Sequence, residues 1–348
     1  MATSGDPRKT DESIRLGHGS GGALMHELIE TVIVDALANP VLEAMEDAAE
    51  LPTVGGHRLE GGRLAVTTDS YVVQPLFFPG GDIGTLAVSG TVNDLAMKGA
   101  RPVCLTLGLV AEEGLALDAL RRVLASIATT ARDAGVAVVA GDTKVVERGG
   151  IGGLVLNTAG IGVIPDGVRS SCDRVQDGDA VIVSGTLGDH ETAILVAREG
   201  LKLEQEIASD CAPLGGLVAA ALEACPETHL LRDPTRGGLA TVLCEVADGA
   251  GVGITIDEAS LPVRPEVRSV CEILGFDPVY MANEGKAVLF VPGDAADDVL
   301  EALRAHPLGR EAALVGRVGG RPGVAVRTVV GGLRPLVMLE AAQLPRIC

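Results

Sequence analysis

The fold class of this chain is decided by residues 64–69 (LAVTTD) and by the longer apolar run at residues 85–98 (TLAVSGTVNDLAMK). The first run is short, rich in β-branched residues and ends in Asp69, which predicts a buried strand. The second run predicts a helix. Another helix is indicated by an apolar stripe with alternating three- and four-residue spacing, formed by Leu117, Leu120, Leu124, Ile127 and Ala131. Residues 136–140 and 154–164 are β-rich, so this half of the chain predicts an alternating α/β unit.

The second half repeats this rhythm. Strands are predicted at 180–184, 252–256, 287–291, 313–318 and 324–330, and helices at 191–198, 237–247, 266–274 and 295–305. We therefore predict four parts: an N-terminal arm with a glycine-rich loop (1–45), an N-terminal α/β domain (46–165), a C-terminal α/β domain (175–333) and a mobile tail (334–348). The similar order of the two halves suggests a distant internal duplication.

Composition limits the classes of partner. The chain has 348 residues, of which 47% are hydrophobic, so it is long enough and apolar enough to form two domains, each with a hydrophobic core. Its net charge of −19 repels phosphate backbones and anionic lipid, which argues against nucleic acid and membrane surfaces as partners. A nucleotide ligand would need local neutralisation by metal ions, lysine or backbone N–H groups.

The cysteines indicate a reducing compartment. Seven cysteines are scattered along the chain without a CxxC pair, which argues against a disulfide scaffold and a structural zinc site. Residues 1–15 contain no apolar signal core, and no run reaches the roughly 18 apolar residues of a membrane helix. We expect a cytoplasmic protein.

A glycine cluster at residues 18–22 (His18, Gly19, Ser20, Gly21, Gly22) precedes an apolar helix. Convergent backbone N–H groups at such a turn, followed by a helix N-terminus, can bind a phosphate. A flexible turn is the alternative for this cluster on its own.

Three aspartates lie at the ends of predicted elements or beside glycines: Asp69 after a strand, Asp94 in the helix at 85–98, and Asp142 after the strand at 136–140. Carboxylates at strand ends and on a neighbouring helix can converge on Mg²⁺, which prefers oxygen ligands. Each of them alone could equally be a cap or turn residue. Asn93 precedes Asp94 and belongs to the same motif.

Three further side chains could serve a phosphate site or proton transfer. Lys144 lies two residues after Asp142, and Arg236 opens a predicted helix beside a glycine pair. Glu284 lies just before a strand and could act as a base, which requires a raised pKa. The alternatives are a solvated lysine and a turn carboxylate.

The chain ends in residues 345–348 (PRIC), which place a thiol at the terminus. Proline favours an extended approach, so the segment reads as an arm that could enter an active site. A frayed end is the alternative. A prenylation signal is excluded, because it needs a cysteine four residues from the end.

Together these motifs resemble the HypE family of hydrogenase maturation proteins, within the superfamily of aminoimidazole ribonucleotide synthetase, selenophosphate synthetase and thiamine-monophosphate kinase. The residues that carry the resemblance follow the expected order over nearly the whole chain: 18–22, 67–70, 77–84, 90–96, 141–146, 233–239, 283–286 and 345–348. The terminal cysteine is the specific feature, because the sister families lack a working one.

The resemblance implies an α/β (α+β) fold with two domains of the aminoimidazole ribonucleotide synthetase type. It also implies a homodimer whose N-terminal halves form a β-barrel-like interface with ATP bound nearby, so that residues 46–165 would be the ATP-binding and dimerisation domain. The implied reaction is the ATP-dependent dehydration of an S-carbamoyl group on Cys348 to a thiocyanate, for the cyanide ligand of a nickel–iron hydrogenase. HypF is the implied carbamoyl donor, and a HypC–HypD scaffold is the implied acceptor.

The same resemblance implies roles for the site residues. Cys348 would carry the substrate group, and Glu284 would take the proton, with Lys144 either coupled to it or the base in its place. Mg²⁺ would bind to Asp69, Asp94 and Asp142, and ATP phosphates would contact the loop at 18–22, Asn93 and Arg236.

Two other functions remain open. The chain could be another ATP-dependent synthetase of the superfamily, although a selenophosphate synthetase would want a cysteine near its glycine loop and none occurs before Cys104. It could also be a non-enzymatic thiol carrier, which would not turn over ATP.

Overall fold

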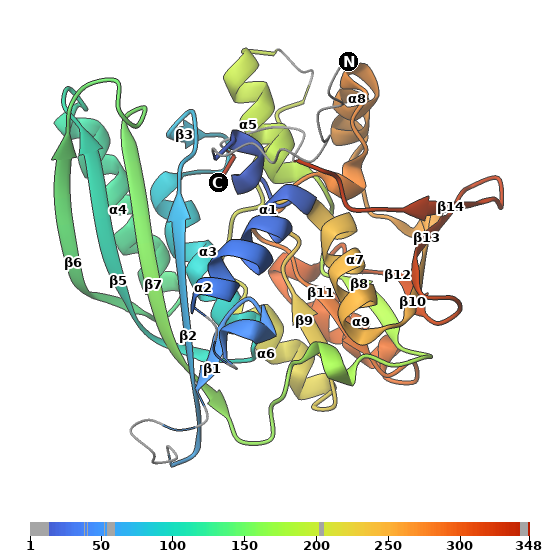
Figure 1. The fold of residues 1–348 in the computed structure, drawn as a ribbon. Helices are drawn as coiled ribbons and strands as arrows, with labels where there is room; N and C mark the ends of the chain where they lie inside the picture. The colour runs from blue at the N-terminus through green and yellow to red at the C-terminus, as the bar shows by residue number, and fades with distance from the viewer. Residues whose placement is uncertain are drawn as a thin grey trace, which may run out of the picture.

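The computed structural model describes residues 14–37, 39, 41–51, 53, 60–201, 205–341 and 347–348. Two α/β domains lie side by side, with the N-terminal helical segment and the C-terminus at their junction (Figure 1). This arrangement confirms the two-domain α/β prediction. Among the described residues, no helix has the length and hydropathy needed to cross a bilayer.

The first domain is a five-stranded sheet in the order β1-β2-β7-β5-β6. Its strands are β1 (Ala49–Leu51), β2 (Gly62–Tyr71), β5 (Arg101–Glu112), β6 (Ala137–Val146) and β7 (Leu154–Pro165). Only β5 and β6 pair in parallel; the other neighbours are antiparallel. A small ribbon, β3 (Phe77–Phe78) and β4 (Gly81–Asp82), precedes the helices. The strand β6 forms the outer edge of the sheet, at the left of Figure 1.

Two helices cover one face of this sheet, α3 (Ile83–Met97) and α4 (Leu117–Asp133). The helix predicted from the stripe at residues 117–131 is α4, but its buried face differs from that stripe: Val123, Ile127 and Ala131 are buried, whereas Leu117 and Leu124 are 66% and 40% exposed. In contrast, α3 is buried almost all round, as expected for a helix with apolar residues on every face. It begins at Ile83 because Asp82 caps it, accepting hydrogen bonds from two backbone N–H groups. This helix therefore lies inside the molecule and carries Asp94 to the domain junction.

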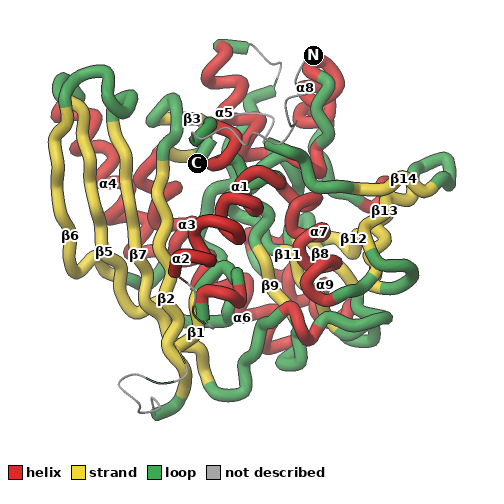
Figure 2. The backbone as a smooth tube through the Cα atoms, in the orientation of Figure 1, coloured by secondary structure: helices red, strands yellow, loops and turns green. Residues whose placement is uncertain are grey.

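The second domain is a seven-stranded sheet in the order β14-β13-β10-β12-β8-β11-β9. Its strands are β8 (Ala180–Val183), β9 (Leu230–Arg232), β10 (Gly253–Asp257), β11 (Val288–Val291), β12 (Ala313–Val318), β13 (Gly323–Arg327) and β14 (Leu333–Leu336). The helices are α5 (Asp189–Glu199), α6 (Gly215–Ala224), α7 (Gly238–Ala250), α8 (Pro265–Leu274) and α9 (Ala296–Ala305). Figure 2 shows how these helices flank the sheet.

Both faces of the second sheet are covered at its centre. In β8, Val181 and Val183 pack in one core cluster with α7, whereas Ala180 and Ile182 pack in another with α6 and α9. This explains why β8 and β11 read as continuous apolar runs rather than as alternating ones.

The N-terminal segment contains α1 (Ala23–Leu28), a π-helical turn (Ile29–Val34) and α2 (Asp35–Leu37). The backbone N–H groups of Ala23 and Leu24 donate to the carbonyls of Leu339 and Glu340. The start of α1 therefore holds the segment that leads to the C-terminus.

Several elements differ from the sequence prediction, and two of these differences concern the candidate site and the tail. Strand β6 continues to Val146, so Asp142 and Lys144 lie within a strand and not after it. Residues 333–336 pair with β13 as β14, so the first part of the predicted tail is a strand of the sheet. The sequence prediction missed strand β14 because the glycine pair before Leu333 is typical of a loop. The strand forms because it pairs with β13, which the local sequence does not reveal.

Candidate active site

A cavity of about 1050 Å³ lies at the junction of the N-terminal segment and the two domains. This volume is at the upper end of the range for small-molecule sites. Its lining combines carboxylates, cations and the terminal thiol from segments far apart in the chain: Gly21, Asp47, Asp69, Asp94, Arg232, Asp233, Arg236, Glu245, Glu284 and Cys348. The lining is therefore chemically suited to a charged ligand and its counter-ions.

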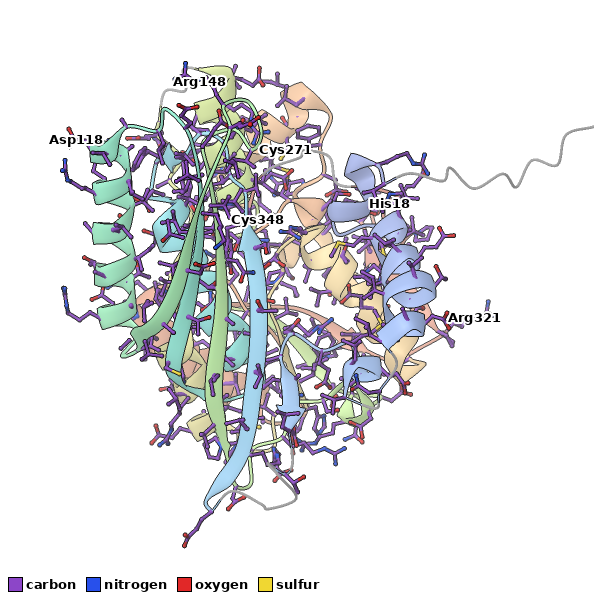
Figure 3. All side chains as sticks on the ribbon, turned by 60° about the vertical axis from the view of Figure 1, so that its left-hand side comes forward. His18, Asp118, Arg148, Cys271, Arg321 and Cys348 are labelled. Carbon is purple, nitrogen blue, oxygen red and sulfur yellow. The ribbon has the colours of Figure 1, made fainter. Side chains whose placement is uncertain are left out.

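The C-terminal residue lies in this cavity. Figures 1 and 3 both place it within the fold rather than at the periphery. The Nε atom of Arg236 donates to the Sγ atom of Cys348 at 3.0 Å, and the side chain of Ile347 is buried with 3% exposure. Pro345 and Arg346 lie outside the described residues, so the prediction of an extended arm concerns a part that is not described.

The docked thiol is held in its neutral form. Burial raises the pKa of the Cys348 thiol to about 12, and Arg236, the largest opposing influence, does not offset it; Glu284 and Asp69 raise the pKa further. The thiolate is the nucleophilic form of cysteine. A sulfur in this position is therefore poorly suited to attack a donor, but it can carry an uncharged acyl group.

The glycine loop is packed against Arg236. Gly21 has φ +78°, and a Cβ atom there would lie 2.4 Å from the Cβ of Arg236. Only glycine permits both the conformation and the approach. Of the loop at residues 18–22, only Gly21 lines the cavity.

The rest of this loop makes contacts with protein groups. The Nδ1 atom of His18 accepts from the N–H of Arg15 at 2.9 Å, and Ser20 donates to the carbonyl of Gly17 at 2.7 Å. A Cβ atom on Gly22 would lie 2.5 Å from the carbonyl oxygen of Leu339. The loop therefore packs against the C-terminal segment. A role in phosphate binding stays a prediction for the other loop residues, His18, Gly19, Ser20 and Gly22.

Five aspartates line the cavity: Asp248 and a group of four formed by Asp47, Asp69, Asp94 and Asp233. Asp69 and Asp94 were identified from the sequence; Asp47 and Asp233 were not. The pKa of Asp94 is raised well above its ordinary value, first by burial and then by the charges of Asp233, Asp69 and Asp47, although Thr67 donates to its carboxylate at 2.7 Å. Such mutual repulsion is relieved when a cation binds.

These carboxylates fit a magnesium ion that is shared with phosphate. Among the residues that the structure describes, no three carboxylates, cysteines or histidines converge as a complete metal site. Mg²⁺ typically takes one or two protein carboxylates and completes its octahedron with water and substrate phosphates. Asp69 and Asp94, supported by Asp47 and Asp233, match that pattern better than a closed protein cage.

The structure does not bring Asp142 and Lys144 to this group within one chain. Neither lines the cavity, and their side chains are 72% and 69% exposed and paired with each other at 3.0 Å. Three strand spacings, about 14 Å, separate their strand from β2. The register that shows this runs Asp69–Thr158, Thr158–Leu107 and Leu107–Gly141. An ion shared by Asp69, Asp94 and Asp142 of the same chain is therefore not what the fold provides.

The side chain of Asn93 is hydrogen-bonded to backbone groups of the second domain and does not face the cavity. Its amide nitrogen donates to the carbonyls of Ala212 and Glu284 at 3.0 and 3.2 Å, and its oxygen accepts from the N–H of Leu214 at 2.7 Å. Both donor hydrogens are thus used by protein carbonyls. The sequence motif located the residue but could not reveal that it ties α3 to the second domain.

Glu284 has the environment that a base near neutrality requires. Burial raises its pKa well above the ordinary value, and the charges of Asp233, Asp210 and Asp69 raise it further against the opposing effect of Arg236. Its Oε1 atom has no hydrogen-bond partner among the described residues. Its backbone N–H donates to the carboxylate of Asp210 at 3.0 Å, and this contact holds the residue at the cavity wall.

Some site residues carry a weak sequence signal. Asp233 stands next to Arg232 and three residues before Arg236, so the motif around Arg236 could have pointed to it. Asp47 lies in an acidic stretch typical of a solvated surface, and its burial comes from Arg232, which pairs with it at 2.8 Å. That contact joins residues far apart in sequence and leaves no local pattern.

Known proteins match this chain over both domains. Residues 45–164 match the family model "AIR synthase related protein, N-terminal domain", and residues 176–329 match "AIR synthase related protein, C-terminal domain". The chain is 50% identical to carbamoyl dehydratase HypE of Azotobacter vinelandii over 338 residues, 97% of each chain.

Solved structures lead to the same group. The chain is similar to a protein in a crystal structure of a HypE–HypF complex, with TM-score 0.84, 45% identity, and coverage of 90% of this chain and 99% of that one. It is also similar to a hydrogenase maturation protein HypE solved in complex with ATP, with TM-score 0.79, 46% identity, and coverage of 97% and 100%.

Proposed function

Because the chain belongs to the HypE family of carbamoyl dehydratases, we propose that it uses ATP to dehydrate an S-carbamoyl group on its own Cys348 to a thiocyanate. The product supplies the cyanide ligand during maturation of a nickel–iron hydrogenase. The observation that carries this proposal is the position of the Cys348 sulfur, 3.0 Å from Arg236 in a cavity lined with buried carboxylates.

The reaction needs ATP because the carbamoyl oxygen is a poor leaving group in water. Transfer of the γ-phosphoryl group to that oxygen releases ADP and a proton from the nitrogen, and gives an S-bound imidate phosphate. Loss of inorganic phosphate with the second N–H proton then forms the C≡N bond. The sum is one ATP used and the elements of one water removed from the carbamoyl group.

Positioning and charge neutralisation are the main demands of phosphoryl transfer. Arg236 faces the sulfur and so lies beside any group carried on it. Asp69 and Asp94, with Asp47 and Asp233, would hold Mg²⁺. When bound, this ion neutralises phosphate charge.

Proton removal from the carbamoyl nitrogen is assigned to Glu284. Its raised pKa makes the carboxylate a stronger base than a solvated glutamate. The neutral, docked thiol implies that charging of Cys348 by a donor takes place with the tail outside the cavity.

A homodimer is part of the proposal, with Lys144 and Asp142 serving the site of the second subunit. Strand β6 has no buried residue, although it carries Val139 and Val145, which are 64% and 71% exposed. An apolar edge strand left open invites pairing with another chain. A second copy on this edge would cover the valines and present Lys144 to a site that its own chain cannot reach.

The proposed partners follow from the reaction. HypF is the carbamoyl donor, supported by the HypE–HypF complex of a similar protein. A HypC–HypD scaffold is the proposed acceptor of the cyano group. The seven cysteines are all unpaired, which supports a cytoplasmic location.

The mass of the C-terminal peptide tests the function. Protein incubated with HypF and its substrates should gain a carbamoyl group on Cys348, and ATP with Mg²⁺ should then remove one water. Cys348→Ala is the matched control and should show neither change. A carbamoylated peptide whose mass stays constant while ATP is present would leave only the thiol-carrier function.

A further inference from the structure

The last peptide of the chain is held by a contact that the reaction does not use. The Nε2 atom of His190 lies 2.8 Å from the carbonyl oxygen of Ile347, the residue before Cys348. His190 is the second residue of α5 and is fully buried. Together with Arg236 on the sulfur, it contacts the terminal dipeptide on both sides of the Cys348 Cα atom.

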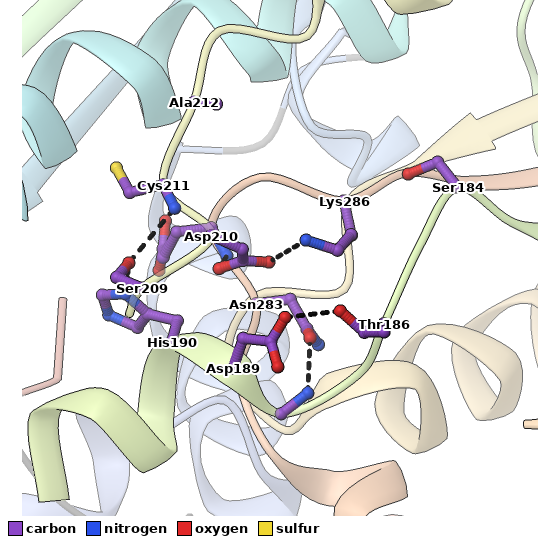
Figure 4. Close-up of polar contacts among 12 residues, drawn as sticks. Ser184, Thr186, Asp189, His190, Ser209, Asp210, Cys211, Ala212, Asn283 and Lys286 are labelled. Carbon is purple, nitrogen blue, oxygen red and sulfur yellow. Dashed lines mark hydrogen bonds and ion pairs between the residues drawn. The ribbon is translucent and has the colours of Figure 1, made fainter. Parts of the chain in front are cut away.

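The proton arrangement at His190 follows from its neighbours. The N–H of Cys211 donates to the Oγ atom of Ser209 at 3.1 Å, and this Oγ lies 2.8 Å from Nδ1 of His190 (Figure 4). The hydroxyl hydrogen of Ser209 is thus available to donate to Nδ1. A carbonyl can only accept, so the proton of His190 belongs on Nε2, where it is donated to Ile347.

The surroundings keep His190 in place. Phe78 of β3 contacts the ring edge-to-face, with centroids 5.6 Å apart and an interplanar angle of 90°. The charged groups nearby are Asp210 and its partner Lys286, whose nitrogen lies 2.9 Å from the Asp210 carboxylate (Figure 4). Burial lowers the pKa of His190, which keeps the ring neutral and preserves the tautomer.

One loop connects this contact with the proposed base. Ser209 orients His190, and the next residue, Asp210, accepts from the backbone N–H of Glu284 at 3.0 Å. The position of the terminal carbonyl and the position of Glu284 are therefore set by adjacent residues.

We propose that His190 is a positioning residue that docks the C-terminal tail by donating a hydrogen bond from Nε2 to the Ile347 carbonyl. The purpose of this docking rests on the function proposed above. Because the contact is to the main chain, it is available whether the sulfur is free, carbamoylated or cyanated. It places the sulfur at Arg236 and Glu284 without depending on the cargo.

The alkylation rate of Cys348 tests this docking. It is measured on the full-length protein in the presence of a non-hydrolysable ATP analogue and Mg²⁺, and the extent of alkylation is determined from the masses of the peptides. His190→Phe keeps an aromatic ring next to Phe78 but removes the donor, and we expect Cys348 to react about tenfold faster, the effect of one lost hydrogen bond. His190→Gln retains a donor near the Nε2 position and should change the rate less than about threefold.

Cys271, which is 1% exposed, reports on general loosening in the same sample. Faster labelling of Cys348 with Cys271 still protected supports the proposal. Equal rates in His190→Phe and the unmodified protein overturn it, and so does an equal acceleration at both cysteines. Ser209→Ala provides a milder second variant, for which a rise smaller than that of His190→Phe is expected and no rise counts against the tautomer argument.

The rate of dehydration of carbamoylated Cys348 distinguishes a failure of the docking proposal from a failure of the proposed function. In His190→Phe, kcat for loss of water should fall while ATP affinity and carbamoylation of the undocked tail remain. If no variant or unmodified protein dehydrates the group, the function fails, yet the labelling result still decides whether His190 docks the tail.

Discussion

Strands β6 and β8 have similar apolar sequences but opposite surroundings. In β8, all four residues are fully buried between α7 on one side and α6 and α9 on the other. In β6, no residue is buried, and the strand forms the edge of its sheet. The second domain therefore completes its own core, whereas the first leaves an apolar strand uncovered, with Asp142 and Lys144 on it. The proposed homodimer rests on this contrast, because a second copy would cover the strand that the first domain leaves exposed.

The largest effect is expected when Lys144 and Cys348, which the proposed site takes from different subunits, are each removed from one of two coexpressed chains. Lys144→Ala should lower dehydration by on the order of 100-fold, as for the loss of a proton-transfer group, and Cys348→Ala should abolish it. Coexpression of the two variants should restore roughly a quarter of the activity, because half of the dimers are mixed and each mixed dimer has one complete site. The measurement is the mass shift of the C-terminal peptide.

The control for this mixing is Cys348→Ala coexpressed with Glu284→Gln. Glu284 and Cys348 belong to the cavity of the same chain, so no mixed dimer has a complete site, and activity should not return. Recovery in this control, or none with Lys144→Ala, would contradict a site built from two subunits.

A charged side chain introduced on β6 should prevent a second subunit from pairing with this strand. Val139→Glu buries a carboxylate in the proposed interface and should weaken dimerisation by tenfold or more, because an unpaired buried charge is costly. Val330, which is 90% exposed on the loop between β13 and β14, offers the matched control Val330→Glu. Sedimentation velocity over a range of concentrations should show a shift to monomer for the first variant alone; identical behaviour of both would argue against β6 as the interface.

The clustered carboxylates predict a cation effect that depends on pH. Burial and neighbouring charge raise the pKa of Asp233 to about 8, from an ordinary value of 3.8. A carboxyl group with a raised folded pKa binds protons more tightly in the folded state, so the free energy of unfolding decreases as pH rises from about 4 to about 8. A fixed Mg²⁺ concentration of about 100 times the Kd at pH 8 should stabilise the fold by about 2.7 kcal/mol at pH 8, and by less at pH 6, where protons compete with the ion for the carboxylates. Thermal unfolding measures this; an equal gain at both pH values would place the ion elsewhere.

The smallest effect is expected at the domain junction. Asn93→Ala leaves the N–H of Leu214 and the carbonyl of Ala212 without their partner, which should lower the free energy of unfolding by about 1–3 kcal/mol. ATP affinity of the folded protein should change little, because the amide holds backbone groups. Urea unfolding and nucleotide titration distinguish this role from phosphate binding, which would show a large loss of affinity with unchanged stability.

Local patterns were sufficient for the fold class and for part of the site. The helix α4, the apolar helix α3 and the continuous apolar strands β8 and β11 follow from local patterns, which short windows of sequence contain. The terminal thiol, Asp69, Asp94, Arg236 and Glu284 were found from their residue types and the glycines beside them, and the fold brings all five to one cavity.

The tertiary structure alone decided the contacts between distant segments. His190 meets Ile347 across 157 positions, and Asn93 meets Leu214 across 121, so neither contact has a local signal. The exposure of β6 depends on its place at the edge of a sheet, which composition does not encode. The sequence by itself determined which groups can react, because reactivity belongs to residue type. Their grouping and their pKa values depend on burial and on neighbouring charge, which exist only once the chain has folded.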